Sequence, residues 1–527
     1  MYKDICAQVS SRYRYSPTGS DDPHGMKTEK REHSMNTATD TQPGLISARN
    51  LTMLVDFYEL TMANGFLENG LGNVTACFDL FFRKVPDQGG YAIMAGLEQA
   101  IDYLKNLRFT DADIQYLREK GIFSESFLQY LAGFEFSCDV WAIPEGTPIF
   151  PHEPLVTVRG PAMQAQFIET MLLLTVNHQS LIATKANRIV RAADGRPVME
   201  FGSRRAQGSD GALYGARAAY IAGAAGTACA ICDREFGVPA LGTMAHSWVQ
   251  MFPTELDAFR AYAKVYPDAC TLLVDTYHVL KSGVPNAITV FQELKAAGHV
   301  PQGIRIDSGD IAYLSKKARM MLDEAGLPEV KIVASNSLDE YIIRDLLVQG
   351  AQIDSFGVGE RLVTSRSEPV FGGVYKLAAA GTAEHPETLI PKIKISENAA
   401  KITNPGFKAP WRLFDGETGM AIADVIALAD EVIDDTKPYV IFDPEFTYKR
   451  KTLTNFRAVR LQVPVFEKGK CVYESPSIEE MRSYCTEQLS AIWDEVKRFE
   501  NPHAYYVDLS EPLWKLKREM LDKYFSE

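Results

Sequence analysis

The sequence predicts an α/β protein whose central part is a (β/α) barrel. Short apolar strands alternate with helices between about residue 197 and residue 362, and this alternation is typical of a parallel sheet. Polar residues or glycines follow each strand, as they do on the catalytic face of a barrel. Six such repeats, roughly 25–45 residues apart, favour a barrel over an open Rossmann sheet.

The region before the barrel is expected to mix helices and strands. Residues 52–70 have helical spacing and stop at an Asn-Gly pair, whereas residues 74–86 alternate in the manner of a strand. Pro and Gly punctuate the next apolar stretches. We expect helices over 96–107 and 111–132, short strands over 134–160 and a long, largely buried helical passage over 165–193.

The barrel elements follow in order. Each expected strand is a short apolar run with a polar or glycine-rich end, and the helices between them have apolar residues at helical spacing. The strands are expected within 197–205, 238–247, 269–278, 301–310, 330–337 and 354–362. The helices are expected within 256–267, 285–299, 311–326 and 338–350.

Composition excludes several classes of protein. With 527 residues, 46% of them hydrophobic, the chain can bury a large core and is expected to form two or three domains. The net charge of −13 argues against nonspecific nucleic-acid binding, which needs clustered Lys and Arg. No run approaches the roughly 18 apolar residues of a membrane span, so no membrane partner is expected.

The ends and the cysteines give further expectations. The polar segment 1–44 lacks the apolar surface for a core and is interpreted as a disordered tail without a secretory signal. Eight scattered cysteines are typical of a reduced, cytoplasmic protein. Cys229 and Cys232 form a CxxC pair that has no second ligand pair for zinc, so an ordinary buried helix is expected there.

The polar residues at the strand ends suit a phosphorylated sugar as a set. Arginines grip phosphate or carboxylate, aspartates hold Mg²⁺ or a sugar hydroxyl, and glycines let a phosphate approach the backbone. The set comprises Arg204, Arg205, His246, Asp275, Arg305, Asp307, Asn336, Gly357 and Gly359.

Three of the candidate sites also have a purely structural interpretation. His246 is either a core histidine bonded to a carbonyl or a nucleophile towards a phosphoryl group. Asp310 is either part of the SGD turn that meets phosphate or a helix N-cap. Arg204 and Arg205 are either ligand-binding residues or a salt-bridging pair at the rim.

Several ordered segments resemble the nicotinate phosphoribosyltransferase family. The resemblance runs through most of residues 50–380 and continues less distinctly into the C-terminal part. The segments that carry it are FDLFFRKVPDQGGYAIMAGLEQAIDYL (78–104), EFGSRRAQG (200–208), GTMAHSW (242–248), LLVDTY (272–277), GIRIDSGDIAYLS (303–315), ASNSLDEY (334–341), FGVGERLVTS (356–365) and GGVYKL (372–377).

The resemblance implies an irregular (β/α) barrel of the type II phosphoribosyltransferase kind, packed with an α/β N-terminal domain. The implied parts are the tail at 1–44, the N-terminal α/β domain at 45–190, the catalytic barrel at 191–380 and a C-terminal segment at 381–527 that packs on the N-terminal domain. The resemblance also implies a homodimer with shared active sites.

The implied reaction joins nicotinate to phosphoribosyl pyrophosphate and forms nicotinate mononucleotide and pyrophosphate, in NAD biosynthesis. ATP is the implied co-substrate, Mg²⁺ is the implied cofactor, and ATP hydrolysis proceeds through a phosphohistidine at His246. The resemblance makes His246, Asp275 and Asp307 catalytic, with both aspartates near the metal. It assigns substrate binding to Tyr58, Phe201, Arg204, Thr243, Arg305, Ser335, Asn336 and Gly359.

Three positions depart from the family pattern. Ala228 stands where nicotinamide-using relatives carry Asp, which favours the acid as substrate. Glu360 replaces a common Thr of the phosphate loop, and His278 replaces a usual Asp beside Asp275. The alternatives are an enzyme that uses nicotinamide or quinolinate, and a catalytically degenerate barrel that only binds or regulates.

Overall fold

The computed structural model describes residues 49–398 and 401–525. The tail expected at residues 1–44 lies outside these residues. Among the described helices, none is long and apolar enough to cross a membrane. The described chain contains two large sheets, one parallel and one antiparallel, and a smaller mixed sheet.

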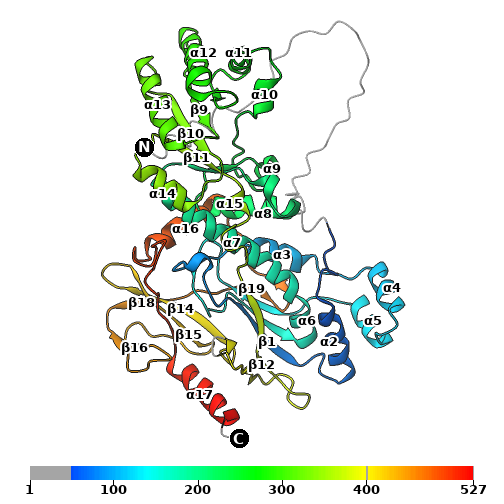
Figure 1. Ribbon diagram of the computed structural model, residues 1–527. Coiled ribbons are helices and arrows are strands. Elements are labelled where there is room, and N and C mark those ends of the chain that lie inside the picture. The colour runs from blue at the N-terminus through cyan, green and yellow to red at the C-terminus, as the bar shows by residue number, and fades with distance from the viewer. Residues whose placement is uncertain (1–48, 399–400, 526–527) are drawn as a thin grey trace, which may run out of the picture. The chain divides into compact units, whose positions relative to one another are not determined.

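The predicted parallel sheet is present. Its six strands run in the order β7-β6-β11-β10-β9-β8, and every neighbouring pair is parallel. Helices α12, α13 and α14 lie beside β9, β10 and β11 (Figure 1). The strands are β6 (Val198–Glu200), β7 (Gly226–Thr227), β8 (Thr271–Leu273), β9 (Gly303–Ile306), β10 (Lys331–Ser335) and β11 (Ser355–Val358).

The prediction of a strand within 238–247 is wrong. Only one isolated bridge forms there, between Thr227 and Ala240, because Pro239 has no N–H to donate to a ladder. Thr227 N–H donates to Pro239 O, and Leu241 N–H donates to Thr227 O. The segment therefore follows the edge of β7 without becoming a strand. In the part of the chain that the structure describes, the parallel sheet has no strand from residues 238–247 between β7 and β8.

The helices expected between the barrel strands are confirmed. Cys232 lies within α9 and Cys229 is its N-cap, and both thiols are buried and free. The described helices of this region are α8 (Gly208–Ile221), α9 (Ala230–Phe236), α10 (His246–Gln250), α11 (Glu255–Val265), α12 (Val284–Ala296), α13 (Ile311–Glu324), α14 (Glu340–Val348) and α15 (Glu360–Val363). The 3₁₀ turn η2 (Ser203–Arg205) and the π-helical turn η3 (Val279–Gly283) complete it.

The antiparallel sheet combines strands from three parts of the chain. Its order is β13-β12-β1-β5-β3-β19-β20, and all of its pairings are antiparallel. The strands are β1 (Thr75–Phe81), β3 (Asp139–Ala142), β5 (Val156–Pro161), β12 (Val374–Ala380), β13 (Ile390–Pro391), β19 (Val463–Glu467) and β20 (Lys470–Cys471). A small pair, β2 (Ala92–Ile93) and β4 (Pro148–Ile149), lies apart from this sheet.

The N-terminal helices occur where the sequence predicts them, with two breaks. The stretch 111–132 forms two helices, because Gly121 leaves α4 with a φ of 68° and Ser124 caps α5. The buried passage 165–193 is divided at Ile168. The helices are α2 (Phe57–Glu68), α3 (Leu97–Lys105), α4 (Asp111–Glu119), α5 (Glu125–Ala132), α6 (Ala162–Phe167) and α7 (Glu169–Ala192), with the 3₁₀ turn η1 (Pro86–Gln88) before α3.

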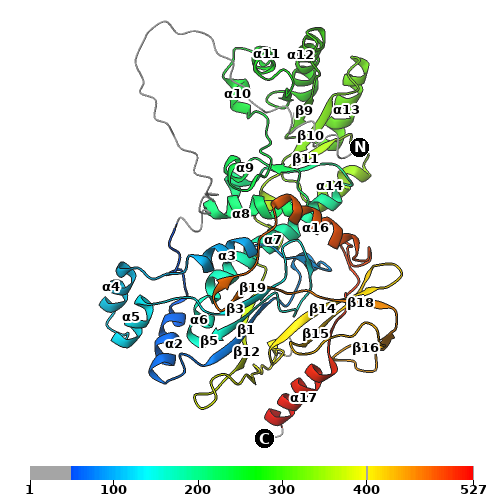
Figure 2. The same ribbon diagram turned by 180° about the vertical axis from the view of Figure 1, so that it is seen from behind.

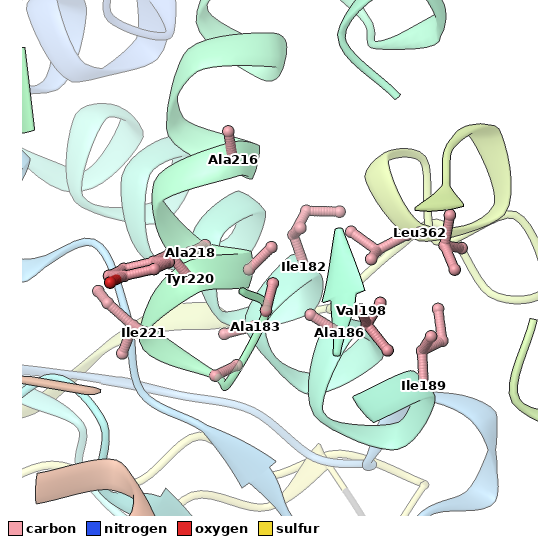
Figure 3. Close-up of a cluster of buried hydrophobic side chains, with 14 of the residues drawn as sticks. Ile182, Ala183, Ala186, Ile189, Val198, Ala216, Ala218, Tyr220, Ile221 and Leu362 are labelled. Carbon is pink, nitrogen blue, oxygen red and sulfur yellow. The ribbon is translucent and has the colours of Figure 1, made fainter. Parts of the chain in front are cut away.

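Helix α7 connects the N-terminal elements to the barrel. Its apolar side chains pack against α8, β6 and α15, as Figure 3 shows for Ile182, Val198 and Leu362. Lys185 of α7 donates to Glu340 Oε1 of α14 (2.9 Å) and to Asp87 Oδ2 (3.0 Å), with these side chains almost fully buried. Loss of one partner of such a pair costs about 3–5 kcal/mol because it leaves a buried charge unpaired, so the junction requires both partners together.

The C-terminal part adds a mixed sheet. Its order is β18-β14-β15-β21, with β15 and β21 parallel and the other pairs antiparallel. Figure 2 shows α17 beside this sheet, where Leu513 packs against Ile426. The elements are β14 (Lys408–Asp415), β15 (Ala421–Leu428), β16 (Tyr439–Phe442), β17 (Arg450–Leu453), β18 (Phe456–Arg460), β21 (Val507–Leu509), α16 (Ile478–Ser490) and α17 (Glu511–Phe525). The domain boundaries at 190 and 380 stay predictions.

Candidate active site

The carboxyl ends of the parallel strands bring most of the predicted site residues to one face. Phe201 follows β6, Asp275 lies two residues after β8, and Asp307 follows β9. Ser335 ends β10, and Gly359 follows β11. Parallel strands in register place their carboxyl ends side by side, so residues distant in the sequence meet here.

Arg305 is the centre of this face. Its Nε donates to Ser335 Oγ (2.9 Å), its Nη1 to Thr243 Oγ1 (3.2 Å) and its Nη2 to Asp307 Oδ1 (3.0 Å). The guanidinium also lies over the ring of Phe201, 5.6 Å from the ring centre. Three of the five guanidinium N–H donors are engaged, which leaves two for a ligand carboxylate or phosphate.

His246 lies at the start of α10 with 41% of its side chain exposed. Its Nδ1 is 3.2 Å from Thr276 Oγ1, and its Nε2 is 3.7 Å from Asp307 Oδ2. The interpretation as a core histidine bonded to a carbonyl is therefore wrong. The imidazole is held between a hydroxyl and a carboxylate, and it remains open to a ligand.

The two aspartates differ in their contacts. Asp307 Oδ1 accepts hydrogen bonds from Arg305 and from the Ser335 hydroxyl. Asp275 Oδ2 accepts from Ser308 Oγ (2.6 Å), whereas no described residue bonds the buried Asp275 Oδ1. A buried carboxylate oxygen without a partner is an unsatisfied acceptor that a cation or a ligand hydroxyl can engage.

These residues fit Mg²⁺ better than a metal held by protein alone. Among the described residues, no group of three His, Cys, Asp or Glu side chains could hold a metal ion. Mg²⁺ usually takes one or two carboxylates, with the other ligands supplied by water and substrate phosphates. Asp275, with its unpaired oxygen, and Asp307 match that ligand set.

Within the ranges that the structure describes, three predicted residues, Arg204, Asn336 and Tyr58, form no hydrogen bond with the residues around Arg305 or Asp275. Arg204 is exposed in η2, and the structure gives its guanidinium no partner among the described residues. Asn336 is exposed after β10 and has a φ of 88°. Tyr58 lies on α2, which packs against α6, and no ring contact joins it to Phe201 in the described part of the chain. Tyr58 is 42% exposed.

Gly357 and Gly359, at the strand ends, differ in how closely Phe201 approaches them. A Cβ on Gly357 would stand 2.5 Å from the Phe201 ring, so only glycine lets the ring lie there. A Cβ on Gly359 would be 3.2 Å from the Phe201 carbonyl oxygen, a less severe approach. Gly357 therefore has the clearer role in placing the aromatic side chain.

The structure resolves the alternative left open for Asp310 and shows the contacts of two departures from the family pattern, His278 and Glu360. Asp310 accepts from Tyr313 N–H (2.9 Å) and is an N-cap of α13. His278 Nδ1 accepts from Lys281 N–H (3.2 Å) and caps η3, which gives this departure a structural reason. Glu360 forms an exposed ion pair with Arg366 (3.2 Å).

Sequence reasoning missed three residues that support the site. Thr276 contacts His246, and Glu200 and Thr227 bond each other beneath Phe201 (2.7 Å). Thr276 follows Asp275 directly, so its position in the LLVDTY segment was an available signal. Glu200 had a comparable signal as the first residue of the segment EFGSRRAQG, whereas Thr227 lies in none of the segments that carry the resemblance.

The fold and the site define a (β/α)-barrel enzyme that acts on an anionic, phosphorylated substrate. Comparison with known proteins makes this definite: the chain belongs to the nicotinate phosphoribosyltransferase (NAPRTase) family. The family model matches residues 197–401, the NAPRTase N-terminal domain matches residues 53–177, and the nicotinate phosphoribosyltransferase C-terminal domain matches residues 407–517.

Individual relatives agree with the family models. A nicotinate phosphoribosyltransferase of Bacillus subtilis is 43% identical over 472 residues, which cover 90% of this chain and 95% of the relative. The crystal structure of human nicotinic acid phosphoribosyltransferase is 30% identical, with a TM-score of 0.78 over 88% of this chain and 99% of that one. A nicotinate-nucleotide pyrophosphorylase from Pyrococcus furiosus shares the fold at 22% identity, with a TM-score of 0.63 over 88% of this chain and 99% of that one.

Proposed function

We propose that the chain transfers the phosphoribosyl group of phosphoribosyl pyrophosphate to nicotinate. The bond from the anomeric carbon to pyrophosphate breaks as the bond to the pyridine nitrogen forms, so nicotinate mononucleotide and pyrophosphate leave. One observation carries the proposal: Arg305, Thr243, Ser335 and Asp307 form a hydrogen-bonded cluster at the strand ends of a member of this family.

Nicotinate is assigned to the space beside Phe201 and Arg305. The Phe201 ring offers an aromatic face, and the two free N–H donors of Arg305 suit a carboxylate. Thr243 lies within hydrogen-bond reach of the same guanidinium. Fixing the ring in this way directs its nitrogen towards the sugar, and orientation lowers the barrier to transfer.

The phosphate groups are assigned to Arg204, Asn336, Gly359 and the two aspartates. Asp275 and Asp307 would hold Mg²⁺ together with phosphate oxygens. When bound, Mg²⁺ would supply positive charge that stabilises the leaving pyrophosphate. The Arg204 guanidinium, exposed beside the same strand ends, would add a second positive charge.

ATP is proposed to phosphorylate His246. A ring nitrogen of His246 would attack the γ-phosphorus of ATP, so an N–P bond forms while the bond to the ADP oxygen breaks. Water would later hydrolyse the N–P bond, which releases phosphate and restores the imidazole. Support comes from the exposed ring and from its contacts with Thr276 and Asp307, which orient it.

A homodimer with shared active sites and a cytoplasmic location complete the proposal. Tyr58 has no contact with Phe201 in its own chain, and the exposed apolar face of α2 also includes Phe57 and Met62. Tyr58 of a second subunit would supply the opposite face of the pyridine pocket. The cysteines of the described residues are free thiols, which supports the reducing cytoplasm.

The test is turnover of purified chain with phosphoribosyl pyrophosphate, Mg²⁺, ATP and either nicotinate or nicotinamide. We expect nicotinate mononucleotide and pyrophosphate in equal amounts, and little product from nicotinamide because the side chain of Ala228 offers no hydrogen-bond acceptor for a carboxamide. If product forms from nicotinamide but not from nicotinate, nicotinamide is the substrate. If product forms from neither, the chain is a barrel that only binds.

A further inference from the structure

Glu200 is a buried carboxylate next in sequence to Phe201, to which the nicotinate ring is assigned. It ends β6, its side chain is fully buried, and it precedes Phe201. Its Oε1 accepts from Gly202 N–H, and its Oε2 accepts from Thr227 Oγ1 (2.7 Å). No ion pair joins Glu200 to a basic side chain among the described residues. Two fixed donors therefore hold a carboxylate that no cation neutralises.

The first donor belongs to the turn that carries the aromatic ring. Phe201 N–H donates to Val358 O (2.7 Å), which anchors the turn to β11. A Cβ on Gly202 would meet Val363 at 2.5 Å and Glu200 Oε1 at 2.7 Å, so the turn packs without spare room. The bond from Gly202 to Glu200 thus fixes the direction in which the Phe201 ring leaves the strand.

The second donor belongs to the turn that carries Ala228. Thr227 Oγ1 accepts from Cys229 N–H (3.0 Å) while it donates to Glu200. Ala228 N–H donates to the backbone oxygen of Glu200 (2.9 Å). Glu200 therefore contacts both sides of this turn, through its side chain and through its backbone.

We propose that Glu200 is a positioning residue that holds Phe201 and Ala228 in place as two walls of the nicotinate pocket. The inference rests on the proposed function, because it takes nicotinate as the ligand of that pocket. Glu200 itself does not touch the substrate in this proposal. It acts through the two turns that its carboxylate joins.

The carboxylate is the group that the donors require. Gly202 N–H cannot rotate, so a glutamine at this position must turn its carbonyl oxygen towards Gly202. Its NH₂ group would then face Thr227 Oγ1, whose own proton would lose its buried acceptor. Burial raises the pKa of Glu200, whereas the bonds from Thr227 and Gly202 oppose this shift. The two hydrogen bonds favour the charged form, although burial outweighs them.

The test compares kinetic constants of four proteins: wild type, Glu200→Gln, Thr227→Val and Glu153→Gln. Glu153 is a matched control, since it is equally buried and accepts a backbone hydrogen bond, from Phe150, in the loop between β4 and β5 outside the barrel. We expect the KM for nicotinate to rise at least ~10-fold in both pocket variants, since Glu200→Gln leaves the Thr227 hydroxyl proton without its buried acceptor and Thr227→Val removes that hydroxyl. The KM for phosphoribosyl pyrophosphate should change less than about twofold, as in the control.

The double variant sharpens the result. Because both substitutions disturb the same contact between residues 200 and 227, Glu200→Gln with Thr227→Val should raise the KM for nicotinate no further than the larger single effect. If Glu200→Gln does not fold, as judged by thermal unfolding, the KM values of Thr227→Val alone test the role of Glu200. Equal rises in both KM values, or an unchanged KM for nicotinate, would overturn the role of Glu200. A wild-type chain that forms no nicotinate mononucleotide would instead overturn the proposed function and this inference with it.

Discussion

Arg305 joins residues from separate parts of the chain, because Thr243, Asp307 and Ser335 follow different segments of the sheet. Arg305 and Asp307 were predictable from their places near a strand end, whereas Thr243 and Ser335 were assigned from the family resemblance. Their hydrogen bonds were not predictable, because the partners of these bonds depend on the order of the strands in the folded sheet, where β10 lies between β9 and β11. Glu200 and Thr227 escaped prediction for the same reason.

At His246, substitution by alanine should separate ATP use from sugar transfer. The variant loses the nitrogen nucleophile but keeps Arg305, Asp275 and Asp307, so stimulation by ATP should vanish while some uncoupled transfer continues. The measurement is the rate of nicotinate mononucleotide formation with and without ATP. Undiminished stimulation by ATP in the variant would contradict the role of His246.

At Ala228, substitution by aspartate should shift the substrate preference. Ala228 is exposed beside the predicted pyridine pocket, where a new carboxylate would repel nicotinate and accept from a carboxamide. A hydrogen bond to a charged group contributes about 1.5–3 kcal/mol, so the nicotinamide-to-nicotinate ratio of kcat/KM should rise by about 10- to 100-fold. Ala228→Asn is the control without charge. An unchanged ratio would show that Ala228 does not face the substrate.

Among the elements, helix α2 is fixed to the start of α7 by a buried carboxylate. Glu59 Oε1 accepts from Thr170 N–H (3.2 Å) and Thr170 Oγ1 (2.6 Å), and Asp56 N–H donates to Thr170 Oγ1 (3.1 Å). Helix α7 has no side-chain cap at Ile168. Glu59 therefore provides a capping acceptor from another helix, directly beside Tyr58.

Stability should depend on the charge of Glu59. Burial raises the pKa of Glu59 from an ordinary 4.5 to about 7, so ionisation is harder in the folded state than in the unfolded state. Stability present below about pH 4.5 is then lost as the pH rises towards 7. Glu59→Gln, which stays neutral, should unfold at a higher temperature than wild type near pH 8 and show little difference near pH 4.5.

The exposed Glu119→Gln on α4 is the control for this measurement, because its side chain is already solvated. Thermal unfolding across this pH range compares the three proteins. A constant difference between Glu59→Gln and wild type at every pH would contradict the raised pKa of Glu59.

Most elements were predictable because their signals are local. Helices α12, α13 and α14 have apolar spacing and clear ends, and Asp310 and Asp339 cap two of them. The segment 238–247 was predicted wrongly because its apolar residues suggested a strand, although Pro239 prevents regular pairing. The two-residue strand β7 is too short to leave a pattern.

At the scale of the whole molecule, the antiparallel sheet was not predictable. Residues 374–391 and 463–471 join strands from 75–161, and no local pattern encodes pairing over such separations. The junction formed by Lys185 and Glu340 has the same character, since 155 residues separate the partners. Long-range ion pairs and sheet order follow from the complete fold.

Shared active sites predict recovery of activity in mixed dimers. Tyr58→Ala and His246→Ala should each lose ATP-stimulated transfer, because one removes a pocket wall and the other removes the nucleophile. After co-expression, half of the dimers carry both variants, and one of their two sites is intact. About one quarter of the wild-type ATP-stimulated activity should return. No recovery in dimers shown to be mixed would place Tyr58 and His246 in the same subunit's site.

Incubation of the chain with ATP labelled at the γ-phosphate tests directly whether His246 is phosphorylated. We expect one label per chain at His246, labile in acid, stable in base and absent from the His246→Ala variant. Nicotinate and phosphoribosyl pyrophosphate should discharge the label as nicotinate mononucleotide forms. If the chain makes nicotinate mononucleotide in an ATP-dependent manner without label on His246, or with label on another residue, His246 is not the phosphoryl acceptor.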